Sequence, residues 1–364
     1  MMSFAQWGNA LYSGDKSYAV VPKRRLFVGI AAVVIIIGLL LPLFVGLNRS
    51  IEFTGGAQFD VANVSDQSET KASEIVTATK IVDTAKVTRV GTSSVRIQTA
   101  SVDSDQAAQI RDALAAGYSV DPADVQSSSI GPSWGQSVTS KAAQSLVIFM
   151  VLVALLMTVY FRSWTMAAAA LLALVHDVAV TLAVFVITQV EVSPATVIGF
   201  LTILGYSLYD TVVVFDKVRE LTQDLYDQKR YTFAEYVNLA VNQTMVRSIN
   251  TSVVALLPVG AILIIGSLML GTGTLTDISL ALFVGMIAGT YSSIFIASPL
   301  LVMFQEHLAR TKEHDAVVAK ERAGRLAVSE GPGRGASAAV KVAPIAPGHR
   351  LPNASQPRRK KAGR

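Results

Sequence analysis

The sequence contains no cysteine, which excludes both a disulfide framework and a thiolate metal site. It also contains little charge: Asp, Glu, Lys and Arg make up 16% of its 364 residues, compared with about a quarter in soluble domains. Hydrophobic residues make up 51%. These proportions exclude an ordinary soluble enzyme and indicate a polytopic α-helical membrane protein.

The apolar residues are gathered into runs of about 20, the length of helix that crosses roughly 30 Å of hydrocarbon. Because a bilayer offers no partner to unpaired backbone groups, such runs are expected to be helices. They predict six transmembrane helices, the first at 26–47 and five more within 141–304, namely at 142–161, 165–188, 194–215, 245–268 and 278–304.

The short loops 189–193 and 269–277 contain no Lys or Arg, whereas Lys23, Arg24 and Arg25 precede the first helix. Positively charged loops remain in the cytoplasm. Residues 1–25 and 305–364 are therefore expected to be cytoplasmic, in a multi-pass protein of the plasma membrane.

The C-terminal tail, residues 305–364, is rich in Pro, Gly and Ala and includes the basic run 358–361. Its composition is typical of disorder. Its charge favours anionic lipids as a partner, and no nucleic-acid partner is expected. The positive-inside rule alone is the simpler explanation of this charge.

Residues 48–140 interrupt the apolar pattern between the first two helices and are rich in Ser, Thr, Asp and Val. Segments 57–61, 86–90 and 94–98 alternate with a period of two, whereas Ala107, Ile110 and Leu114 repeat at helical spacing. The order strand, helix, strand, strand, helix, strand predicts an extracytoplasmic α+β domain with a ferredoxin-like βαββαβ fold.

This domain contains no His, no Cys and no glycine-rich phosphate loop, so we expect no catalytic role for it. Contact with another polypeptide is its expected role. Segment 125–130 offers an edge to which a partner strand could add, but every small sheet has edges, so the two interpretations have equal weight.

Ionisable residues within the predicted helices are the candidates for function, because each costs about 2.5–3.5 kcal/mol at a helix centre. Asp210 shares a polar stripe of the fourth helix with Tyr206, and Arg247 starts the fifth helix, followed by Asn250 and Thr251. These adjacent helices run antiparallel, so Asp210 and Arg247 can approach each other. A carboxylate beside a guanidinium is a candidate proton relay. The alternative is a static ion pair that holds the helices together.

His176 and Asp177 lie in the middle of the third helix, where a second relay position and a helix-packing bond are equally good interpretations. In the sixth helix, small residues recur every four positions and include Gly285, Gly289 and Ser293. Such a stripe allows helix backbones to approach closely. Ordinary tight packing is sufficient to explain it.

Motifs occur in six segments: 51–56 (IEFTGG), 131–133 (GPS), 175–178 (VHDV), 202–216 (TILGYSLYDTVVVFD), 247–252 (RSINTS) and 289–295 (GTYSSIF). Together they resemble the SecF-type subunits of the bacterial Sec protein-export machinery, within the SecD/SecF family of the resistance-nodulation-division superfamily. The sequence departs from the family pattern at Glu52, where Asp is usual, and at Tyr209, where Asn usually precedes the aspartate.

The resemblance implies a six-helix subunit that pairs with a SecD-like subunit, associates with the SecYEG translocon and uses the proton-motive force to promote preprotein export. It places Asp210 and Arg247 at the family's functional aspartate and arginine. It also implies that the protein is not an enzyme and has no cofactor, with protons as the coupling ion.

Three other functions remain open. A proton-driven exporter of lipid or small molecules would use the same charges, but such exporters usually carry twelve helices and two large outer domains. A passive assembly factor would use no proton chemistry. An intramembrane aspartyl protease would match Tyr209 and Asp210, yet its Gly-x-Gly-Asp motif is absent from the next helix.

Overall fold

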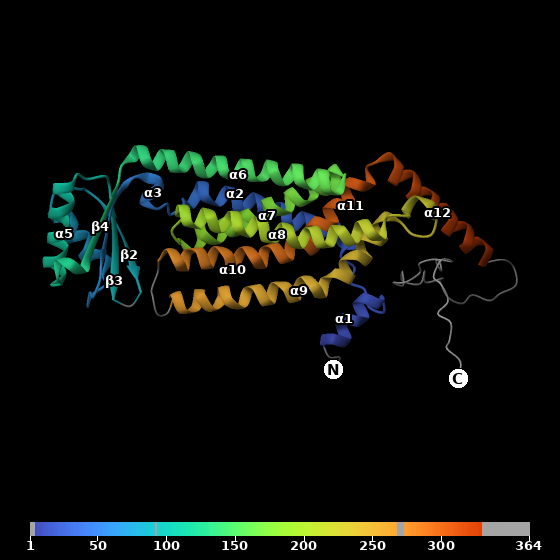
Figure 1. Ribbon diagram of the computed structural model, residues 1–364, viewed down its shortest axis with the longest axis horizontal. Helices are drawn as coiled ribbons and strands as arrows, with labels where there is room; N and C mark the ends of the chain where they lie inside the picture. Colours follow the sequence, from blue (N-terminus) through green and yellow to red (C-terminus); the bar gives the residue numbers. More distant parts are fainter. Residues whose placement is uncertain (1–3, 92, 268–272, 330–364) are drawn as a thin grey trace, which may run out of the picture.

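The computed structural model describes residues 4–91, 93–267 and 273–329 (Figure 1). Within these ranges, six helices are long and apolar enough to cross a membrane. They run along the long axis of the molecule, with an α/β domain at one end and helices α1 and α12 at the other (Figure 1). We call these the domain end and the terminal end. The arrangement confirms a polytopic helical protein with one inserted domain.

The membrane-length helices are α2 Arg24–Val45, α6 Pro132–Phe161, α7 Trp164–Thr188, α8 Pro194–Leu221, α9 Phe233–Ile265 and α10 Thr274–Ser292. The last continues through a π-helical segment, η5 Ser293–Ala297, into α11 Ser298–Glu306. Pro299 is the second residue of α11, and because it has no N–H it removes one bond from the helical ladder there.

Two helices begin well before their apolar runs. Helix α6 starts at Pro132, with proline at the first helical position, rather than at 142. Helix α9 starts at Phe233 rather than at 245, because the side chains of Thr232 and Glu235 form a capping box there. The apolar runs therefore predicted only the C-terminal part of each of these two helices.

The α/β domain consists of β1 Gly56–Val61, α4 Glu69–Ala78, β2 Ala85–Val90, β3 Ser94–Thr99, α5 Ser104–Tyr118 and β4 Val125–Ile130. Its strands form an antiparallel sheet in the order β2-β3-β1-β4, which confirms the predicted βαββαβ fold. Helices α4 and α5 cover one face and bury Phe59, Ile97 and Leu114 completely. Strand β4 lies at an edge of the sheet.

The other face of the sheet is polar. Asp60 of β1 is paired in register with Arg96 of β3, and Gln58 with Gln98. These residues alternate with the core residues along each strand, so their side chains point away from α4 and α5. Figure 1 shows the sheet between α5 and the helix bundle, so this polar face is turned towards the bundle.

The remaining short elements are α1 Phe4–Ser13, η1 Val21–Lys23, α3 Ile51–Thr54, η2 Pro122–Asp124 and η3 Leu225–Asp227. Segment η3 belongs to the connection between α8 and α9 at the terminal end. Helix α12 Ala309–Ser329 lies at the same end (Figure 1).

The expected disorder of the tail from residue 305 onwards is wrong for α12. Thr311, His314 and Val318 recur at helical spacing and are buried. The Thr311 hydroxyl lies 3.2 Å from the Tyr226 hydroxyl, and His314 Nε2 lies 2.8 Å from the Gln228 carbonyl oxygen. These contacts attach α12 to the connection between α8 and α9. The polar composition of the tail gave no indication of them. Residues 330–364, including the basic run, lie outside the described residues.

Candidate functional site

The candidate residues lie where α7, α8, α9 and α10 pack together. Glycines on α10 allow this close packing: a Cβ atom added to Gly289 would lie 2.8 Å from Ser207 Cβ, and one added to Gly285 would overlap Ile203. The small-residue stripe of α10 therefore lies against α8. This approach brings the hydroxyl groups of the α10–η5 segment within reach of the buried carboxylates.

Asp210, on α8, is 5% exposed. Ser293, the first residue of η5, donates a hydrogen bond from Oγ to Asp210 Oδ2 at 2.5 Å. Ser248 is fully buried on α9, and its hydroxyl group also approaches Asp210. The carboxylate is thus enclosed by hydroxyl groups from two neighbouring helices.

Arg247 lies on α9 with an exposed side chain. It is close enough to act electrostatically on Asp210, but the ion pairs of the described residues do not include one between the two. The static ion pair is therefore not formed in this conformation. Thr251 donates to the Arg247 carbonyl oxygen at 2.9 Å within the same helix, and Asn250 is exposed, so neither contacts the carboxylate.

Asp177, on α7, is fully buried and holds three helices together. Its Oδ2 accepts hydrogen bonds from Ser207 Oγ of α8 at 2.5 Å and from Ser292 Oγ of α10 at 2.9 Å. Its Oδ1 lies 3.2 Å from Nδ1 of His176. Asp177 is therefore the more completely bonded of the two carboxylates.

Neighbouring residues connect the two carboxylate sites. Ser292 and Ser293 are consecutive in the chain, yet the first donates to Asp177 and the second to Asp210. Ser207 donates to Asp177 and lies one turn before Asp210 on α8. The two carboxylates are therefore bonded to consecutive residues of the same segment.

Sequence reasoning selected Ser293 only for its small size and did not select Ser207, Ser248 or Ser292. Two signals were available: Ser207 lies three residues before Asp210, and two serines stand together in the sixth helix. Helical spacing shows which residues share a face, but not which neighbouring helix that face meets.

Tyr206 belongs to a separate chain of hydroxyl groups. Its OH donates to Ser252 Oγ at 3.4 Å, and Ser252 Oγ lies 2.5 Å from Thr290 Oγ1. This chain joins α8, α9 and α10 without touching Asp210.

Polar side chains are exposed along α8 and α9. Tyr209, next to Asp210, is 55% exposed, and Thr202 is exposed on the same helix. Arg247 and Asn250 are exposed on α9. These groups lie within helices that are otherwise apolar enough to span a membrane.

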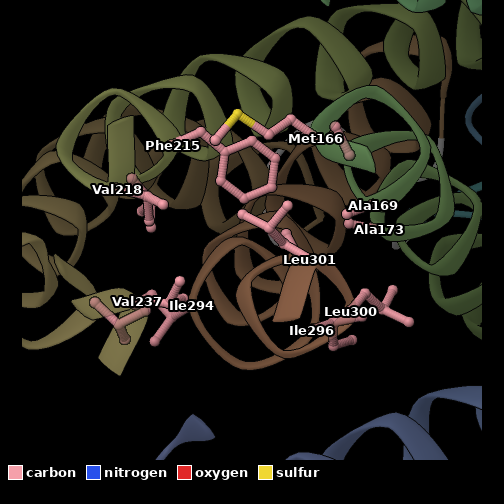
Figure 2. Close-up of a cluster of buried hydrophobic side chains, with 14 of the residues drawn as sticks. Met166, Ala169, Ala173, Phe215, Val218, Val237, Ile294, Ile296, Leu300 and Leu301 are labelled. Atoms are coloured by element: carbon pink, nitrogen blue, oxygen red, sulfur yellow. The ribbon is translucent and has the colours of Figure 1, made fainter. Parts of the chain in front are cut away.

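A large apolar cluster lies between the carboxylates and the terminal end. Phe215 of α8 belongs to a cluster of buried side chains that also includes Met166 of α7, Val237 of α9 and Leu301 of α11 (Figure 2). Phe215 is fully buried and lies just over one turn beyond Asp210. The cluster therefore separates the carboxylates from the terminal end.

The α/β domain is bound to the bundle by a cluster that sequence reasoning missed. Arg96 donates to Asp60 Oδ1 at 2.8 Å and to Glu191 Oε2 at 3.1 Å, and Gln98 donates to Glu191 Oε1 at 2.6 Å. Burial opposes the charge of Arg96, but hydrogen bonds and attraction from Asp60 and Glu191 prevail and raise its pKa. Glu191 lies between α7 and α8, the helices that carry the two carboxylates.

Main-chain hydrogen bonds strengthen this contact. The Ser50 N–H donates to the Val192 carbonyl oxygen at 3.0 Å, and the Val192 N–H donates to the Asn48 carbonyl oxygen at 2.7 Å. Lys86 of β2 donates to the Asn48 side chain, and burial lowers the pKa of Lys86 despite the attraction of Glu191. The α7–α8 connection is therefore fixed to both the sheet and the end of α2.

In the described ranges, no group of three or more His, Cys, Asp or Glu side chains is placed to hold a metal ion. Hydroxyl groups and one imidazole surround the two buried carboxylates. Such groups exchange protons and hydrogen bonds.

Comparison with known proteins identifies relatives along most of the chain. The family model described as "Protein export membrane protein SecD/SecF, C-terminal" matches residues 109–307. A protein translocase subunit SecF from Streptomyces coelicolor is 44% identical over 335 residues, covering 91% of this chain and 88% of that protein. SecF from Mycobacterium tuberculosis is 39% identical over 322 residues, covering 86% of this chain and 72% of that protein.

A solved structure supports the same relationship. The crystal structure of SecDF, a translocon-associated membrane protein from Thermus thermophilus, matches with a TM-score of 0.72 and 28% identity. The match covers 81% of this chain but only 39% of the SecDF chain. The region matched by the family model contains both buried carboxylates and Arg247. From its motifs, fold and relatives, the chain belongs to the SecF family of protein translocase subunits.

Proposed function

We propose that the protein uses the proton-motive force, together with a SecD-like subunit, to promote protein export through the SecYEG translocon. One observation carries this proposal: Asp210 is buried among hydroxyl groups at a helix junction and is not ion-paired with Arg247. A carboxylate without a fixed countercharge can gain or lose a proton, and movement of a nearby guanidinium changes how readily it does so.

The orientation that suits this function has both termini in the cytoplasm and the α/β domain outside. The loop 189–193, which contacts that domain, contains no Lys or Arg. Protons from outside would then reach Asp210 from the domain end. The apolar cluster around Phe215 would keep them from passing freely to the cytoplasm.

The exposed sides of α8 and α9 are the proposed contact with a SecD-like subunit. Polar groups such as Tyr209, Arg247 and Asn250 are costly when they face lipid. This chain covers only 39% of the SecDF chain, so the rest of that polypeptide is long enough to contain a second subunit. Preproteins are the proposed substrates at the outer domain, and anionic lipids the proposed partner of the basic tail.

Asp210→Asn should abolish the dependence of export on the proton gradient while the protein remains folded and assembled. Asn is nearly isosteric and can still accept the Ser293 hydrogen bond, but it cannot take up and release a proton. One charge crossing 100 mV yields about 2.3 kcal/mol, enough to bias two states that differ by a few kcal/mol. The measurement is preprotein release into membrane vesicles with and without an uncoupler.

Asp224→Asn is the control, because this exposed aspartate lies beyond the end of α8. It should respond to the uncoupler as the wild type does. Pull-down of the SecD-like subunit reports assembly. If the Asp210→Asn variant assembles and export remains as sensitive to the uncoupler as in the wild type, the proposed proton-driven function of this protein is wrong. A role as a passive assembly factor would then be favoured.

A further inference from the structure

The Ser293 hydroxyl lies between two hydrogen-bond acceptors. Its Oγ is 2.5 Å from Asp210 Oδ2 and 3.1 Å from the carbonyl oxygen of Thr290, one turn earlier. Ser293 is fully buried. A hydroxyl group has one proton to donate but two lone pairs to accept with, so it can donate to only one of these oxygens at a time.

The two protonation states of Asp210 require opposite orientations of this hydroxyl. When Asp210 is ionised, Ser293 donates its proton to the carboxylate. When Asp210 is protonated, its own O–H can donate to Ser293 Oγ, and the Ser293 proton turns to the Thr290 carbonyl. Each state keeps its buried polar groups bonded, and only rotation about the Cβ–Oγ bond separates them.

We propose that Ser293 is a positioning residue for proton exchange at Asp210, in which its hydroxyl rotates between the carboxylate and the Thr290 carbonyl as the proton binds and leaves. This inference rests on the proposed function and specifies how the site accommodates both protonation states. Without the hydroxyl, Asp210 would lose the hydrogen bond that it receives from η5, and only the Ser248 hydroxyl would remain beside it, which is unfavourable for a buried carboxylate.

The surroundings of Ser293 fit this role. Its backbone is held next to Ser292, whose hydroxyl is bonded to Asp177 at 2.9 Å. The π-helical segment begins at Ser293 itself, and π segments occur frequently at functional sites. The charged or titratable groups that face this site from the packed helices are Arg247 on α9 and the pair of His176 and Asp177 on α7.

The test compares Ser293→Ala, which removes the hydroxyl, with Ser293→Thr, which keeps it. Ser279→Ala is the matched control: Ser279 is also buried on α10, but its hydroxyl donates only to the Leu275 carbonyl. Each variant is assayed in the assembled translocase for uncoupler-sensitive preprotein release across a series of external pH values. Pull-down of the SecD-like subunit reports assembly.

Ser293→Ala should lower the uncoupler-sensitive release at neutral pH by roughly tenfold and move its midpoint to higher pH by about one unit. The direction follows because charge-assisted hydrogen bonds are the stronger ones, so the ionised form loses more than the protonated form. Ser293→Thr and Ser279→Ala should give profiles close to the wild type.

A Ser293→Ala profile that coincides with the wild type overturns the proposal. So does an alanine variant that fails to assemble, because Ser293 would then be a structural residue, and so does a threonine variant as defective as alanine. Asp210→Asn is run in parallel. If that variant remains sensitive to the uncoupler, the proposed function fails; if it is insensitive while Ser293→Ala is normal, only the role of Ser293 is wrong.

Discussion

The two buried carboxylates differ in how firmly they are held. Asp177 has two serine donors and an imidazole around it, from three helices, whereas Asp210 has one serine donor, Ser293, and the hydroxyl group of Ser248 nearby. The sequence predicted Asp210 as a functional residue because a lone charge in a membrane helix is costly. The sequence did not decide between a relay role and a packing role for Asp177, because the partners of Asp177 come from helices that are far apart in the chain.

Asp177→Asn should therefore destabilise the protein, whereas the same change at Asp210 should not. All the neighbours of Asp177 are able to donate, so an amide nitrogen placed among them leaves at least one donor unbonded, at a cost of about 1–3 kcal/mol. Thermal unfolding of the purified protein should show a lower Tm for Asp177→Asn, with Asp210→Asn as the matched control. Equal Tm values for the two variants would contradict a structural role for Asp177.

At the scale of elements, alternation and apolar runs predicted the main strands and the membrane helices. They did not predict the N-terminal ends of α6 and α9, which extend into polar sequence. They also did not predict α12, because its buried residues lie in a polar segment. They also gave no sign that Gly38 of α2 packs against the Ala179 backbone of α7. Local pattern defines an element, but its neighbours decide where it ends and what it touches.

Gly289→Ala should destabilise the contact between α8 and α10. The added Cβ would lie 2.8 Å from Ser207 Cβ, so the helices must separate, at a cost of about 1–3 kcal/mol. Gly29→Ala on α2 is the control, because nothing lies within 4 Å of its added Cβ and alanine favours a helix. Thermal unfolding should show opposite shifts for the two variants; a Tm for Gly289→Ala at or above the wild type would contradict close packing.

At the scale of the whole molecule, the cluster of Arg96, Gln98 and Glu191 connects the α/β domain to the helices that carry the carboxylates. In the sequence, the loop 189–193 is distinctive only because it lacks Lys and Arg. Its contact with β3 depends on how the domain sits over the bundle, which no local pattern encodes. A shift of the domain is therefore transmitted directly to the ends of α7 and α8.

Glu191→Gln should loosen this attachment without unfolding the domain. Its partly buried ion pair with Arg96 would be lost, so backbone amides of Ser50 and Val192 should exchange hydrogen roughly tenfold faster. Glu69→Gln is the control, because Glu69 and Arg89 form an exposed pair at 3.7 Å. Hydrogen–deuterium exchange with mass spectrometry measures both; unchanged exchange at Ser50 and Val192 in Glu191→Gln would show that the main-chain bonds alone hold the domain.

The early start of α6 makes this helix a lever. Its 30 residues extend about 45 Å as one uninterrupted rod, longer than the roughly 30 Å of hydrocarbon it crosses. The projecting end is attached to the domain, since a Cβ added to Gly55 would lie 2.8 Å from Pro132 Cα. A tilt of about 10° at the terminal end would thus swing the far end by about 8 Å. A small change of angle at the terminal end is therefore amplified along α6 into a displacement the size of a side chain at the domain end.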